Sequence, residues 1–143
     1  MMTPAMRSER GQAVLEFALA LPFLIAFIMF ITDAGFFAYS YISVTNAVRE
    51  GARCAAVGRG DTEIAKQVRA TSGGLAIPGT ISVSPSEADR GVIGSSVTVS
   101  AEFTYSWITP VNIIPGLSLL DRPFSKQVVM RMETNNVDPT KPC

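Results

Sequence analysis

Apolar positions are concentrated near the N-terminus of this chain, whereas the remaining positions have the composition of an ordinary soluble domain. Residues 12–57 hold 32 apolar residues in 46 positions. A helix of roughly 20 apolar residues crosses the ~30 Å hydrocarbon core of a bilayer. We therefore expect one long helix over residues 12–57, with a transmembrane part over residues 12–37 and an amphipathic extension over residues 38–57.

The extension is predicted from apolar residues that recur every three or four positions, the period of one helix face. Gly58 and Gly60 are expected to end this helix, because glycine readily adopts the backbone conformation that follows a helix C-terminus. Pro22 removes one backbone hydrogen bond inside the span and is expected to kink it. The residues of the predicted stripe are Phe37, Tyr41, Val44, Val48, Ala52 and Ala55.

Aromatic residues also mark the expected end of the span, where side chains with an apolar body and a polar tip favour the membrane interface. This predicts an aromatic belt made by Phe36, Phe37, Tyr39 and Tyr41.

Residues 58–143 predict a small α+β domain with a short helix and an antiparallel sheet. The helix is expected from Asp61 to about Thr71, with Asp61 as its N-cap. Three strands are predicted from alternating apolar and polar residues, at about 81–83, 97–107 and 124–133.

Two further segments of this domain are rich in proline. The connection over residues 110–123 allows two interpretations, a lid that closes the sheet edge or an exposed contact surface. The polar tail over residues 135–143 is predicted to be loosely held.

Charge and composition exclude several classes of function. The chain has 12 Lys plus Arg, 12 Asp plus Glu and no His. Without a basic excess it is not expected to bind nucleic acid, and without His it lacks the commonest general base and metal ligand. The pairs Asp89-Arg90 and Asp121-Arg122 are predicted to be solvated loop charges. We therefore expect no enzyme activity, cofactor, metal site or small-molecule substrate.

Two carboxylates, Glu16 and Asp33, are the only charged residues between positions 12 and 48. A charge inside hydrocarbon costs at least ~2.5 to 3.5 kcal/mol on insertion scales, which makes Glu16 a functional candidate. The alternative is that Glu16 only marks the membrane edge at headgroup level. A secretory signal cleaved after Ala20 is disfavoured, because the strongest apolar run follows that position.

Two sequence motifs resemble the TadE-like family of the tight-adherence (Flp-type) pilus system. The first is Gly11-Gln12-Ala13-Val14-Leu15-Glu16-Phe17-Ala18-Leu19, with Pro22 beyond it. The second is Thr45-Asn46-Ala47-Val48-Arg49-Glu50-Gly51-Ala52-Arg53, in which Arg49, Glu50, Gly51 and Arg53 are the candidate site residues.

The resemblance implies a minor pilin or pseudopilin that functions in pilus assembly. A prepilin peptidase would remove residues 1–11 as a leader by cutting between Gly11 and Gln12, and Glu16 would serve processing or assembly. The implied location is the bacterial inner membrane, with a cytoplasmic N-terminus and a periplasmic domain, or the pilus itself. The implied partners are other pilins or pseudopilins and the pilus secretion platform. The competing hypothesis is an unprocessed, signal-anchored binding module of the envelope.

The two cysteines, Cys54 and Cys143, leave two interpretations open. In an oxidising periplasm a disulfide would tie the tail to the long helix, and closing so long a loop contributes roughly 4 to 5 kcal/mol in the chain-entropy model. The alternative is one buried helix thiol and one free terminal thiol.

Overall fold

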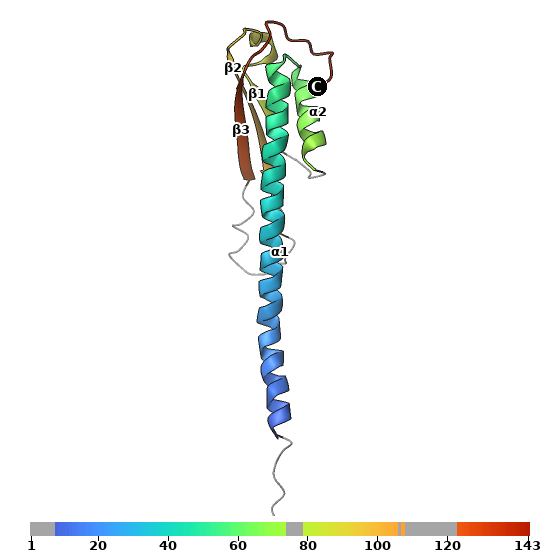
Figure 1. Cartoon of the computed structure of the whole chain (residues 1–143), viewed down its shortest axis with the longest axis vertical. Helices are drawn as coiled ribbons and strands as arrows, with labels where there is room; N and C mark the ends of the chain where they lie inside the picture. Colours follow the sequence, from blue (N-terminus) through green and yellow to red (C-terminus); the bar gives the residue numbers. More distant parts are fainter. Residues whose placement is uncertain (1–7, 74–78, 106, 108–122) are drawn as a thin grey trace, which may run out of the picture. The chain divides into compact units, whose positions relative to one another are not determined.

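The computed structural model describes residues 8–73, 79–105, 107 and 123–143, and these residues form helices and one antiparallel sheet (Figure 1). The chain divides into two compact units, residues 1–36 and 37–143, and the first helix contributes to both. This layout confirms the predicted α+β class. The elements in chain order are α1 (Ser8–Ala56), α2 (Asp61–Thr71), β1 (Ile81–Ser84), the short 3-10 helix η1 (Glu87–Asp89), β2 (Ser96–Thr104) and β3 (Pro123–Arg131).

Helix α1 continues through Pro22 and ends at Ala56, close to the predicted end. Gly58 has a φ of 74°, a left-handed conformation that glycine adopts without steric cost. Its amide donates to the carbonyl oxygen of Ala55 (2.9 Å), and the amide of Arg59 donates to that of Cys54 (3.3 Å). Gly58 therefore terminates the helix as expected, whereas the kink at Pro22 stays a prediction.

The three strands pair in the order β1-β2-β3, with Val99 of β2 opposite Val83 of β1 and Val128 of β3. Alternate residues of β2 are buried, as predicted. However, β2 ends at Thr104 rather than at position 107. Its last pair is with Pro123, and proline has no amide hydrogen with which to extend a strand ladder.

The core of the second unit forms where α2 and the sheet both pack against residues 37–56 of α1 (Figure 1). The predicted stripe of α1 supplies Val44, Val48, Ala52 and Ala55, all fully buried. Helix α2 adds Ile64 and Val68, and β2 adds its inward-facing residues. The connection over residues 110–123, apart from Pro123, lies outside the described residues, as does the pair Asp121-Arg122.

The predicted aromatic belt is divided between two roles. The ring of Phe37 lies 5.5 Å from that of Tyr105 and 5.2 Å from that of Phe124, so Phe37 packs within the second unit. By contrast, Phe36 and Tyr39 are 49% and 53% exposed. Tyr41 is 39% exposed and lies beneath Nζ of Lys126, which is 4.0 Å from its ring centroid, so three of the four belt residues keep exposed surface.

The C-terminal tail is held against the second unit, so the prediction of a loosely held tail was wrong. The amide of Asp138 donates to the carbonyl oxygen of Gly58 (2.8 Å), and Oδ1 of Asn135 accepts a hydrogen bond from the amide of Ile93 (2.9 Å). Just before the tail, the amide of Glu133 donates to the carbonyl oxygen of Ala56 (2.8 Å), the last residue of α1, whose carbonyl cannot be paired inside the helix. Proline-rich composition alone does not reveal such partners.

Candidate functional site

The first candidate site is the N-terminal part of α1, which holds the predicted cleavage position and the lone carboxylate. Gly11, Gln12 and Glu16 are all exposed on this helix. A Cβ atom at Gly11 would meet no other atom within 4 Å. Packing in this structure therefore does not require a glycine at position 11.

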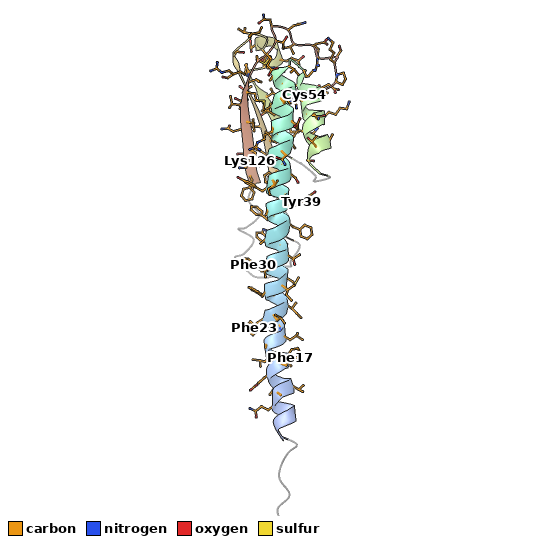
Figure 2. All side chains as sticks on the ribbon, viewed as in Figure 1. Phe17, Phe23, Phe30, Tyr39, Cys54 and Lys126 are labelled. Carbon is orange, nitrogen blue, oxygen red and sulfur yellow. A yellow bond between two sulfur atoms is a disulfide. The ribbon has the colours of Figure 1, made fainter. Side chains whose placement is uncertain are left out.

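The surface of α1 around Glu16 is apolar and open. Figure 2 shows side chains, including the labelled Phe17, Phe23 and Phe30, projecting from α1. These three residues are 63%, 74% and 63% exposed. Within the described residues, α1 is the one helix long and apolar enough to cross a membrane. A protein with this surface is suited to single-pass anchoring in a membrane.

The two carboxylates of the apolar stretch differ in environment. Glu16 is exposed, whereas Asp33 is buried. Asp33 lies seven residues before Ser40, which is also buried, and this spacing places both on one side of a helix. The burial of Asp33 was not predicted from the sequence. The signal that could have predicted it is its helical spacing, four residues before Phe37 of the predicted stripe.

The second motif contains one packing residue and three exposed charges. Gly51 is buried, and a Cβ atom at this position would overlap Cγ2 of Val68 and lie 3.6 Å from atoms of Ile64 and Val99. The glycine therefore allows α2 and β2 to approach α1 closely. Arg49, Glu50 and Arg53 of the same motif are exposed.

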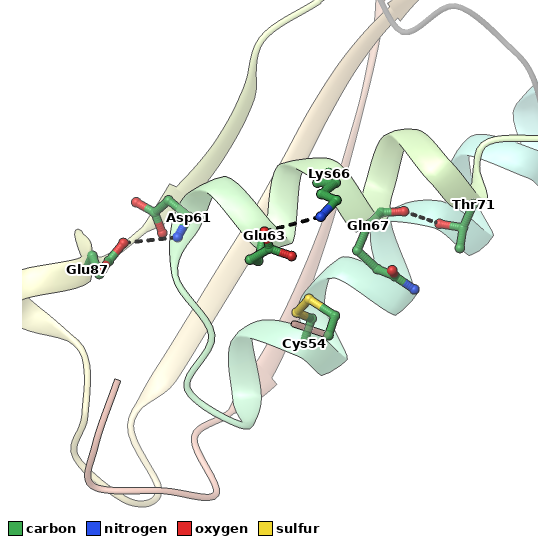
Figure 3. Close-up of a disulfide and its surroundings, with 8 residues drawn as sticks. Cys54, Asp61, Glu63, Lys66, Gln67, Thr71 and Glu87 are labelled. Carbon is green, nitrogen blue, oxygen red and sulfur yellow. Dashed lines mark hydrogen bonds and ion pairs between the residues drawn. A yellow bond between two sulfur atoms is a disulfide. The ribbon is translucent and has the colours of Figure 1, made fainter. Parts of the chain in front are cut away.

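The structure joins Cys54 and Cys143 by a disulfide, with their Cα atoms 5.5 Å apart (Figure 3). Cys54 is buried at the end of α1, beside α2. Pro139 lies so close to Gly60 that a Cβ atom there would be 2.8 Å from it. The tail thus lies close against the segment that connects α1 to α2.

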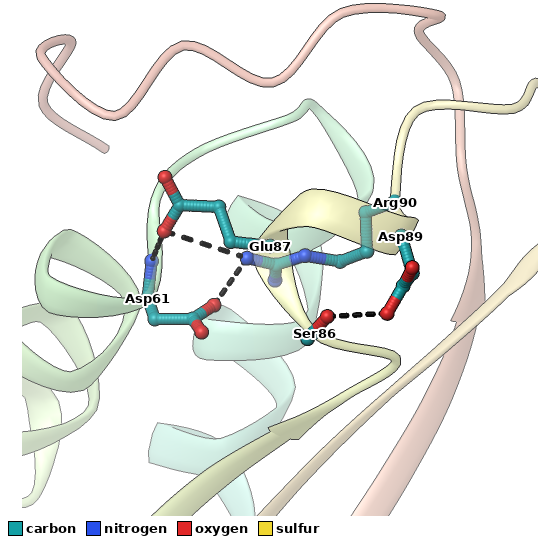
Figure 4. Close-up of polar contacts among 5 residues, drawn as sticks. All are labelled: Asp61, Ser86, Glu87, Asp89 and Arg90. Atoms are coloured by element: carbon teal, nitrogen blue, oxygen red, sulfur yellow. Dashed lines mark hydrogen bonds and ion pairs between the residues drawn. The ribbon is translucent and has the colours of Figure 1, made fainter.

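A buried arginine links α2 to η1, as Figure 4 shows. Arg90 forms an ion pair with Asp61, and its Nη2 lies 4.0 Å from Oε2 of Glu87. Its side chain is 1% exposed, so the prediction that Arg90 is a solvated loop charge was wrong. Its burial could not be read from the sequence, because Asp61 lies 29 residues away.

The same network corrects the expected cap of α2. The N-cap residue is Gly60, which has no side chain, and Asp61 is the first residue of the helix. Oε2 of Glu87 accepts a hydrogen bond from the amide of Asp61 (3.0 Å) and so replaces a local cap. The position of Asp61 in the first turn still favours the helix electrostatically.

Asp138 is the residue of the tail whose ionisation the structure shifts. Two hydrogen bonds from Thr140, one from its hydroxyl (2.6 Å) and one from its amide (3.0 Å), hold the pKa of the Asp138 carboxyl below its usual range. Lys141 acts in the same direction. A lowered pKa means that these contacts stabilise the fold above the usual aspartate pKa, and that this stabilisation is lost as the pH falls through the folded value.

We expect Thr140→Val to raise the pKa of Asp138 toward the usual value, because valine removes the hydroxyl donor and keeps the amide donor. An NMR titration of the Asp138 carboxyl measures this change. Thr134→Val is the matched control, since the hydroxyl of Thr134 accepts from the amide of Asn136 instead. An unchanged Asp138 titration in the Thr140 variant would contradict the assignment.

None of the described segments brings together three or more side chains that could hold a metal ion. The described residues present an exposed apolar helix, a motif with three exposed charges, and a small disulfide-bonded domain.

A comparison with known protein families supports the description of the long helix. The sequence profile of the TadE-like protein family matches residues 11–53. No curated protein and no solved structure matches the chain. The match covers the predicted cleavage position, Glu16, the exposed apolar surface and the second motif, which confirms the resemblance read from the sequence. Over residues 11–53, this chain is therefore similar to the TadE-like protein family.

Proposed function

We propose that this chain is a minor pilin or pseudopilin that helps to assemble a tight-adherence type pilus. The observation that supports this most directly is that the TadE-like match coincides with the exposed apolar helix. The domain of residues 58–143 lies outside that match, so it would supply contacts specific to this subunit. The proposed role is structural, with no catalytic step.

The proposed leader ends at Gly11. A prepilin peptidase in the membrane would cut between Gly11 and Gln12 on the cytoplasmic side. Arg7 and Arg10 precede the span closely and favour a cytoplasmic N-terminus, whereas Arg49, Arg53 and Arg59 follow it at a greater distance and count against this orientation. The positive-inside rule alone therefore does not decide the orientation, which we propose from the family resemblance. Because Gly11 has open space around its Cα, the glycine is explained better by recognition than by packing.

Glu16 would act after insertion. A carboxylate at the edge of hydrocarbon is stabilised by a positive partner. Cleavage would create a free amine at Gln12, and Glu16 lies four residues, about one helical turn, beyond it. A neighbouring subunit with a small axial offset could then place its amine beside this carboxylate.

The disulfide supports a location outside the cytoplasm. Disulfides persist in the bacterial periplasm, whereas cytosolic thiols are kept reduced. The bond between Cys54 and Cys143 lies in the second unit. We therefore place residues 58–143 in the periplasm, with α1 anchored in the inner membrane.

Leader removal is the test of this function. We expect protein extracted from membranes to begin at Gln12 when it is co-expressed with a prepilin peptidase, as determined by N-terminal sequencing and intact mass. Gly11→Val should abolish this cleavage, because the substituted position is the one that the peptidase would recognise.

Gly35→Val is the matched control, since a Cβ atom at Gly35 also meets nothing within 4 Å. This variant should be cleaved normally. A wild-type protein that keeps residues 1–11 would instead favour the unprocessed envelope binding module.

A further inference from the structure

One face of α1 in the second unit remains uncovered by α2 and the sheet. We name it the charged face of α1. Its residues follow one another at helical spacing, and Ile42 and Val57 at its two ends are 59% and 38% exposed. The helix side that carries Val44, Val48 and Gly51 is buried. The residues of the charged face are Ile42, Asn46, Arg49, Glu50, Arg53 and Val57, all exposed.

The three charges of this face have no partner among the residues that the structure describes. Among the described residues, no hydrogen bond or ion pair involves the side chain of Arg49, Glu50 or Arg53, although Glu50 and Arg53 have a spacing that permits a pair on a helix. The charges of this unit that do pair lie in α2, η1 and the tail.

The same three charges belong to the segment that is TadE-like, which ends at Arg53. Gly51 within this segment has a packing role, as its contact with Val68 shows. Since packing does not account for the charges beside it, an external partner is the better explanation.

We propose that the charged face of α1 binds the charged face of a second copy of this chain. The face carries both signs, so it is complementary to itself when two parallel helices are offset along their axes. An offset of three residues, about 4.5 Å at 1.5 Å per residue, brings Glu50 of one copy beside Arg53 of the other. The inference rests on the proposed function, because membrane anchoring of both copies makes their helices parallel.

The anchor sequence favours the same partner. In the first unit, the exposed aliphatic residues Ile31, Ile28 and Leu24 follow one another at spacings of three and four. A partner helix that matches this profile is apolar for its first part and charged with both signs beyond it. A second copy of this chain has that profile.

Charge exchange tests the pairing in the full-length chain. A photo-crosslinking residue replaces Asn46, and two differently tagged copies are co-expressed in membranes. The acidic variant is Arg49→Glu with Arg53→Glu, and the basic variant is Glu50→Arg. Two copies of one variant should crosslink about tenfold less than wild type, because like charges then face each other. One acidic and one basic copy together should restore the wild-type yield.

Arg69→Glu on α2 is the control for charge reversal, because Arg69 is exposed on a different helix of the same unit. Its crosslinking yield should equal that of the wild type. In every variant the Cys54–Cys143 disulfide, read from mobility without reductant, reports that the domain is folded.

Crosslinking that ignores these charges, or that captures only other proteins, would overturn the pairing. Leader cleavage is measured on the same samples and separates the two proposals. Processed protein without charge-dependent crosslinks would contradict the proposed pairing and leave the proposed function intact. Unprocessed protein with charge-dependent crosslinks would overturn the proposed function and leave the pairing intact.

Discussion

Replacing Cys54 with alanine and Cys143 with serine is expected to lower the free energy of unfolding of the second unit by about 4 to 5 kcal/mol. The bond joins residues 89 positions apart. In the chain-entropy model a link across so long a loop restricts the unfolded chain strongly. Denaturant unfolding of the detergent-solubilised full chain, followed by the fluorescence of Trp107, the single tryptophan, measures the loss.

Reductant supplies the control for this double variant. The wild type in reductant should approach the stability of the variant, whereas the variant itself should not respond. Without the disulfide the tail would keep the hydrogen bond from Asp138 to Gly58, that from Ile93 to Asn135 and the packing of Val137, so it should be released at lower denaturant concentration. Identical wild-type midpoints with and without reductant would show that the link does not stabilise the fold.

The elements that the sequence predicts well are those with local periodic signals. The stripe containing Val44 and Val48 and the alternation along β2 both depend on neighbours a few residues away, and both are confirmed. The TadE-like motifs are local as well, which is why the match to the family could be anticipated.

The features that the sequence does not predict depend on contacts between distant positions. Arg90 is buried because Asp61 and Glu87 lie beside it, and the tail is held by a backbone group more than 75 residues earlier in the chain. The polarity of these segments suggested solvent exposure. In the structure, Nη2 of Arg90 is instead paired with Asp61, and the amide of Asp138 in the tail donates to the carbonyl oxygen of Gly58.

Gly51 shows how a family motif can contain a structural requirement and an interaction surface together. On a helix, residues 49, 50 and 53 face a different side from residue 51. The buried position sets the distance between α1 and α2, and the exposed positions remain free for a partner. A substitution at Gly51 should therefore affect stability, whereas substitutions at the charged face should affect association.

We expect Gly51→Ala to destabilise the second unit by up to about 2 kcal/mol net, because overpacking a core costs about 1 to 3 kcal/mol. The added methyl group would overlap Cγ2 of Val68, which is fully buried and has little room to move. This cost opposes the gain in helix propensity, which is about 1 kcal/mol when alanine replaces glycine. The shift in the denaturation midpoint of Trp107 fluorescence measures the net effect.

Two comparisons identify steric overlap as the cause. Gly35→Ala places the same methyl group on α1 in open space and should cost no stability. Val68→Ala removes the atom that the new methyl group meets, so the double variant with Gly51→Ala should lose less stability than the two single losses added together. Strict additivity would show that Gly51 and Val68 do not interact through this contact. The absence of a side chain at Gly51 would then not explain why α2 lies so close to α1.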